Sequence, residues 1–75
     1  MTSHELVAIL GRMYREGKVK REAVPMIHLF GIKYAAEIRA RGESPHRIAE
    51  LATGHHSYGT EINKGMNLAR YVRSL

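Results

Sequence analysis

Residues 44–75 constrain the fold most, because they contain two helix start signals separated by a short polar turn. Ser44 precedes Pro45. A serine oxygen can accept hydrogen bonds from the free amides of a helix start, and proline at the first helical position loses no hydrogen bond. Gly54 can adopt the positive φ that often follows a helix end. The segment therefore predicts a short helix that begins at Pro45 and ends before Gly54.

A second helix start follows this turn at once. Ser57 or Thr60 is the predicted cap, and the helix is expected to continue to Val72. Apolar residues at helical spacing give each of the two helices one face for burial. These residues are Ile48, Leu51 and Ala52 in the first helix, and Ile62, Met66, Ala69 and Val72 in the second.

Another helix is predicted at the N-terminus. Thr2 or Ser3 can cap it, Glu5 matches a capping box with Thr2, and Gly17 is its predicted end. Its apolar residues recur at spacings of three and four, which is typical of a face packed on a core. They are Leu6, Ile9, Leu10 and Met13.

The next predicted helix extends up to about Arg41. It is either continuous through Gly31 or broken there. Glycine costs roughly 1 kcal/mol relative to alanine inside a helix, so its presence requires close packing against another helix or a break of the helix there. We favour a continuous helix, because one apolar stripe passes through the glycine in register. The stripe is Val24, Ile27, Gly31, Tyr34, Ala35 and Ile38. The chain is therefore expected to form a compact all-α single domain of four helices, or of five if the helix breaks.

The composition restricts the partners and the chemistry. The 75 residues include 12 Lys or Arg and 7 acidic residues, and the formal net charge of +5 favours nucleic acid or an anionic membrane surface. All acidic residues are Glu and cysteine is absent, so we expect neither an enzyme nor a cofactor. No apolar run approaches the roughly 20 residues that cross a bilayer, and the N-terminus lacks secretory signal features, so we expect a cytoplasmic protein.

Residues 44–72 resemble helix-turn-helix proteins. The shared features are a small first helix with Ile48-Ala49 and Leu51, a turn containing glycine, and Ile62 in the second helix. The run GHHSYG is longer than the usual connection. The resemblance implies a small regulator or DNA-binding accessory protein that binds double-stranded DNA, and such proteins commonly act as homodimers.

The second helix of this pair has the polar side chains that a recognition helix needs. Asn can pair with adenine, Lys can reach guanine, and hydroxyl groups near a helix N-terminus can bind phosphate. We expect side chains in the first turns of this helix to contact bases, and Asn67 and Arg70 to contact the DNA backbone. The predicted DNA-binding residues are Arg47, His55, His56, Ser57, Tyr58, Thr60, Glu61, Asn63, Lys64, Asn67 and Arg70.

The histidines near the turn do not predict a metal site. His55 and His56 are adjacent and would point in different directions on a regular element, and no Cys or carboxylate completes a tetrahedral set nearby. We interpret them, with His46, as polar turn residues near phosphate. No metal is expected.

A basic cluster surrounds the first inter-helix connection and has two interpretations. It is either a phosphate-binding patch beside the recognition helix or a solvated connector, and Glu16 and Glu22 dilute its charge. Its members are Arg12, Arg15, Lys18, Lys20 and Arg21.

Two other functions stay open. The first helix could dock a partner or a second copy through Leu6, Ile9, Leu10 and Met13, which would make the chain an interaction module without nucleic-acid binding. RNA binding would use aromatic side chains for base stacking, but the one Phe and four Tyr are expected to be mostly structural.

Overall fold

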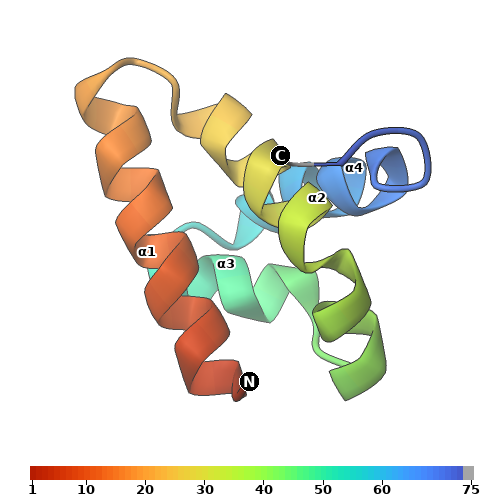
Figure 1. Cartoon of the computed structure of the whole chain (residues 1–75). Coiled ribbons are helices and arrows are strands. Elements are labelled where there is room, and N and C mark those ends of the chain that lie inside the picture. Colours follow the sequence, from red (N-terminus) through yellow and green to blue (C-terminus); the bar gives the residue numbers. More distant parts are fainter. Residues whose placement is uncertain (74–75) are drawn as a thin grey trace.

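The computed structural model describes residues 1–73, which form the all-helical arrangement predicted from the sequence (Figure 1). The elements are α1 (Ser3–Val19), α2 (Ala23–Arg41), α3 (Pro45–Thr53), the 3-10 turn η1 (His56–Tyr58) and α4 (Gly59–Leu68). α1 and α2 form a hairpin, α3 packs against α1, and α4 packs mainly against α2. Within residues 1–73 there is no strand, and no helix is long and apolar enough to span a bilayer.

The start of α1 is fixed by the predicted capping box. The Thr2 hydroxyl accepts a hydrogen bond from the Glu5 amide at 3.1 Å, and the Thr2 amide donates to Glu5 Oε1 at 2.8 Å. The predicted end of this helix at Gly17 was wrong, because α1 continues to Val19. Gly17 is buried where α2 begins, and a Cβ atom there would lie 2.9 Å from the Glu22 carbonyl oxygen. The glycine therefore permits a close approach of the chain instead of ending the helix.

α2 is continuous through Gly31, as favoured from the sequence. A Cβ atom at Gly31 would overlap the Ile62 carbonyl oxygen of α4, and one at Gly65 would overlap the His28 carbonyl oxygen of α2. Close packing against another helix is thus the reason for the glycine. The irregular backbone of α2 lies instead at Tyr34, with φ −114° and ψ 16°.

α3 begins and ends where the sequence predicts. The Ser44 hydroxyl accepts a hydrogen bond from the Arg47 amide at 3.3 Å, and Gly54 has a φ of 81°. The predicted buried face was wrong at Leu51, which is 56% exposed. Ile48 is buried as predicted, and Ala49 is buried in place of Leu51, because α3 is packed between α1 and α4 and turns this side inward.

The predicted cap and the predicted C-terminal end of α4 were wrong. The helix begins at Gly59, and neither Ser57 nor Thr60 caps it. It ends at Leu68, where the following backbone forms turns with hydrogen bonds between residues three apart, such as Tyr71 N to Leu68 O at 2.9 Å. Val72, predicted to be buried, is consequently 48% exposed.

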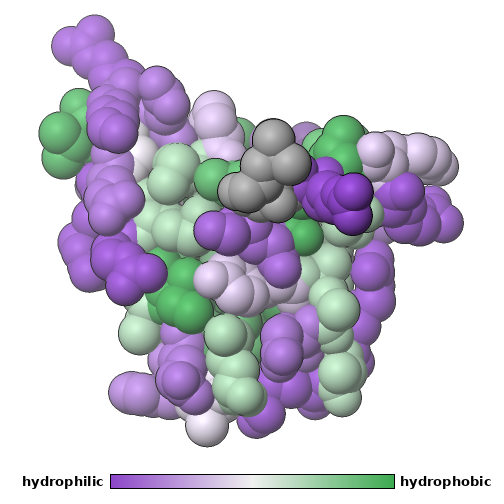
Figure 2. All heavy atoms as spheres, in the orientation of Figure 1, coloured by the Kyte–Doolittle hydropathy of each residue, from purple (hydrophilic) through white to green (hydrophobic). Residues whose placement is uncertain are grey.

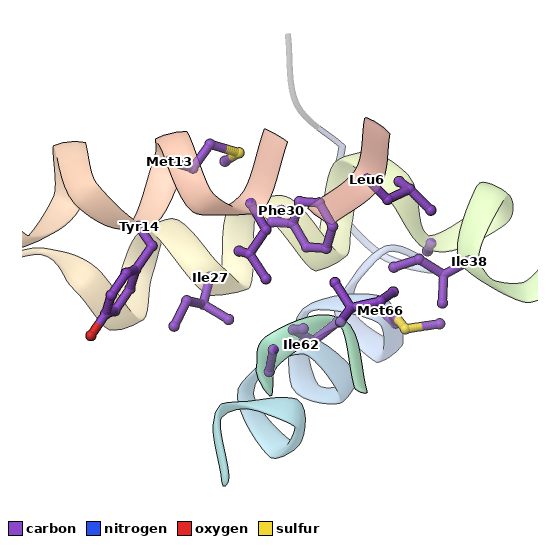
Figure 3. Packing of buried hydrophobic residues seen from close by; sticks show 12 residues of the cluster. Leu6, Met13, Tyr14, Ile27, Phe30, Ile38, Ile62 and Met66 are labelled. Atoms are coloured by element: carbon purple, nitrogen blue, oxygen red, sulfur yellow. The ribbon is translucent and has the colours of Figure 1, made fainter. Parts of the chain in front are cut away.

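The apolar faces of all four helices meet in one core (Figure 3). Tyr14 and Phe30 are buried although they lie outside the predicted stripes. Leu6, Leu10 and Met13 also face this core, so the docking surface suggested for the first helix was wrong. The buried apolar residues are Leu6, Leu10, Met13, Tyr14, Ile27, Phe30, Ala35, Ile38, Ile48, Ala49, Ile62 and Met66.

Candidate nucleic-acid interface

α4 has one buried face and one exposed polar face. Ile62, Gly65 and Met66 are buried against the rest of the protein. The exposed side chains follow one another along the other side of the helix: Thr60, Asn63, Lys64 and Asn67. The structure therefore places these four predicted DNA-binding residues together on the surface of one helix.

The crossing of α2 and α4 determines which side of α4 faces outward. Gly31 and Gly65 lie against each other's helix backbone, and neither position has room for a Cβ atom. Such a contact needs glycine on both helices, since any side chain would push the backbones apart. Because the backbones themselves are in contact, α4 cannot rotate about its axis without losing this packing.

Glu61 binds the scaffold instead of projecting freely. Its Oε1 lies 2.7 Å from His28 Nε2 on α2, and its Oε2 lies 3.4 Å from Lys64 Nζ. The hydrogen bond from His28 is the main cause of the lowered pKa of Glu61. Both carboxylate oxygens thus have partners, and a base contact by Glu61 would compete with them. The contact of His28 with Glu61 could not be predicted from the sequence, because it depends on the α2–α4 crossing.

The connection between α3 and α4 packs against α3 through two histidine rings. The His46 and His56 rings lie 4.9 Å apart, and a Cβ atom at Gly59 would overlap the His46 ring. His56 Nδ1 lies 3.9 Å from Glu50 Oε2. His55, His56 and Ser57 are all exposed around this contact, next to the first turn of α4. The longer connection noted in the sequence therefore forms η1 and still brings these three predicted residues to the start of α4.

Tyr58 links this connection to α1. Its ring packs on the Tyr14 ring at 5.6 Å and on the His55 ring at 5.6 Å. Burial is the main cause of the raised pKa of the Tyr58 hydroxyl. Tyr58 is half-buried, so its ring supports the start of α4, although we predicted it as a DNA contact.

The two predicted arginines lie at the ends of this surface. Arg47, in the first turn of α3, is exposed and lies 3.4 Å from Glu50. Arg70 lies beyond the end of α4, and its guanidinium is 5.8 Å from the Tyr71 ring centre. An open cavity of about 520 Å³ adjoins it, lined by His28, Lys64, Asn67, Leu68, Arg70 and Tyr71. Tyr71 is 79% exposed, which makes it the exception to the expectation that the tyrosines are mostly structural.

Metal-ligating side chains do not converge on this surface. Within the described part of the chain, no three His, Cys, Asp or Glu side chains are placed to hold a metal ion.

The chain matches the sequence model of a protein family. The sequence model of the family described as the HTH-like domain matches residues 2–74, and so includes α1 and α2 as well as the two helices that carried the resemblance. No curated protein and no solved structure matches the chain significantly. Since the family match extends over almost the whole sequence, the chain belongs to the HTH-like domain family.

Proposed function

We propose that this protein binds double-stranded DNA with the exposed face of α4 in the major groove. The observation that carries the proposal is the pairing of a closely packed inner face with a polar outer face on the second helix of the α3–α4 pair. A helix that reads bases must be held firmly and present hydrogen-bonding side chains outward. The family membership supports the same interpretation.

Each part of the surface has a proposed role. Asn63 and Lys64 lie in the first turns of α4 and contact base edges. Thr60, Ser57 and the exposed histidines of the connection contact phosphates beside them. Asn67, Arg70 and Arg47 lie farther along the surface and bind the DNA backbone. His28 occupies one side of Glu61 and holds it away from the groove.

A single module of this kind reads few base pairs, so we propose that two copies act together as a small regulator or a DNA-binding accessory protein. Two copies would require two half-sites at a fixed spacing of about one helical turn or a multiple of it. Selection of bound duplexes from a random pool tests this, and enriched sequences with only one half-site would contradict the dimer.

The central experiment compares two lysines. Lys64→Ala removes an exposed charge from α4, and Lys33→Ala removes one from α2 at a position about 200° around the helix from Gly31, away from α4. We expect Lys64→Ala to weaken binding to duplexes selected by the parent protein, measured by fluorescence anisotropy, and Lys33→Ala to leave it unchanged. Equal binding by both variants and the parent would contradict a reading role for α4.

Asn63→Ala separates base reading from phosphate binding. If Asn63 contacts a base, the variant loses about 1–3 kcal/mol of discrimination between selected and unrelated duplexes. A phosphate contact would instead weaken both classes of duplex alike. The fold should be unaffected, because Asn63 is exposed; the free energy of unfolding checks this.

A further inference from the structure

A single side chain of α1 reaches the residue that precedes α4, although the two lie far apart in the sequence. The Tyr14 ring of α1 packs on the Tyr58 ring, and Tyr58 is the residue that immediately precedes α4. The Lys18 ammonium lies 5.4 Å from the Tyr14 ring centre. The Lys18 ammonium thus contacts the Tyr14 ring, which in turn contacts the Tyr58 ring at the start of the helix proposed to enter the groove.

The charge on this side of α1 is unneutralised. Lys18 follows Tyr14 by four residues, so its side chain lies on the same side of the helix as the Tyr14 contact, and Arg15 neighbours Lys18 because it lies three residues before it. Both are exposed, and no carboxylate within residues 1–73 lies within ion-pair distance of either. By contrast, Lys64 and Arg47 each have a glutamate partner. Hydrophilic side chains line the outer edge of α1 in Figure 2.

We propose that Arg15 and Lys18 form a second phosphate-binding arm, which contacts the DNA backbone beside the groove that α4 enters. The inference rests on the proposed function and adds α1 to its binding surface. A major groove is about 12 Å wide and is bordered on both sides by phosphates, so cations next to the helix start meet one of these borders. Of the two interpretations of the basic cluster, this placement favours the phosphate-binding patch for its Arg15 and Lys18 members.

Arg15 also has a local contact that the test must separate from DNA binding. A Cβ atom at Gly11 would lie 3.3 Å from an Arg15 guanidinium nitrogen and 3.6 Å from the Ala52 carbonyl oxygen. Arg15 therefore lies near the C-terminal end of α3, where a positive charge is stabilising. A loss of DNA affinity alone would not distinguish a direct phosphate contact from a weakened fold, whereas the salt dependence of binding does.

The experiment measures duplex affinity against salt concentration for the parent, Arg15→Gln/Lys18→Gln and Lys33→Gln, with short random-sequence duplexes as the probe. Each lost phosphate contact should reduce the slope of log Kd against log salt by about 0.9, so the double variant should lose about 1.8. The loss should be the same with duplexes selected by the parent, because phosphates do not carry sequence information. Lys33→Gln should keep the parental slope.

Three results would overturn the proposal. A double variant with the parental slope would show that α1 makes no phosphate contact, even though the parent binds duplexes. A lower free energy of unfolding and weaker binding at an unchanged slope would assign Arg15 to the end of α3 alone. If the parent itself does not bind any duplex, the proposed function fails first, and the arm fails with it.

Discussion

The inner face of α4 is packed against the rest of the protein, whereas its outer face is exposed. On the inner face, Gly65 lies against the backbone of α2, and Ile62 and Met66 fill the core. On the outer face, Asn63 and Asn67 are exposed, and their side chains make no hydrogen bond to any residue in the described part of the chain. In a helix built this way, substitutions on the inner face alter the packing of the fold, whereas substitutions on the outer face alter the exposed surface. Glu61 lies at the boundary between the two faces, where its carboxylate contacts His28 and Lys64.

The largest expected effect is at Met66. Met66→Ala should lower the free energy of unfolding by about 2–5 kcal/mol, since Met66 is only 6% exposed and truncation leaves a cavity. Asn67→Ala is the matched control one residue away on the outer face, and should change stability by less than about 0.5 kcal/mol. Urea unfolding measures both. Similar losses for the two variants would break the distinction between the faces.

Gly31→Ala tests the α2–α4 crossing. The added methyl group would overlap the Ile62 carbonyl oxygen, and a helix backbone cannot move aside cheaply. We expect a net loss of about 1–3 kcal/mol in the free energy of unfolding despite the better helix propensity of alanine. Gly11→Ala is the control, because its Cβ atom would approach only the flexible end of Arg15 and a carbonyl oxygen at ordinary distance. The control should be neutral or more stable by up to about 1 kcal/mol; a stabilising Gly31→Ala would mean that the two helices are not in backbone contact.

Ser44→Ala should lower the free energy of unfolding by about 1 kcal/mol, because the Ser44 hydroxyl accepts a hydrogen bond from the Arg47 amide at the start of α3. Ser57→Ala removes the same oxygen from a serine that was predicted to cap α4 but makes no capping bond. Its melting temperature should equal that of the parent. A larger effect at Ser57 than at Ser44 would reverse the assignment of the two helix starts.

The contrast between these two serines shows how much the sequence could predict. The starts at Thr2 and Ser44 were predictable because the capping groups lie within three residues of each other. The start of α4 depends instead on the packing of Gly59 against His46, a contact between residues 13 positions apart. Local patterns do not encode such a contact.

The candidate site follows the same division. The outward positions of Asn63 and Lys64 followed from the periodicity of Ile62 and Met66, and the structure confirms them. The inward partner of Glu61 was not predictable, because His28 reaches it only through the crossing at Gly31. The exposure of Val72 was missed for a related reason: the apolar periodicity continues beyond Leu68, where the backbone leaves the helix.

The smallest expected effect concerns pH and the boundary residue Glu61. Because the hydrogen bond from His28 lowers the pKa of Glu61 in the folded protein, this contact contributes stability above the ordinary value of 4.5, and the contribution disappears as the pH falls through the lower, folded-state pKa. Glu61→Gln should therefore be less stable than the parent at neutral pH, and the difference should shrink once the pH drops below 4.5. Glu37→Gln removes the same charge from an exposed position of α2, and no basic side chain within residues 1–73 pairs with Glu37. This control should show a smaller difference in stability from the parent at neutral pH.

Glu5 and Glu43 also have lowered pKa values, through hydrogen bonds with Thr2 and Ser3, so the parent and both variants all lose stability in acid. The informative quantity is thus the difference in the free energy of unfolding between Glu61→Gln and the parent, measured by urea unfolding at several pH values. A difference that stays constant from neutral pH into this acid range would mean that the ionised Glu61 carboxylate does not help to hold α4 on α2.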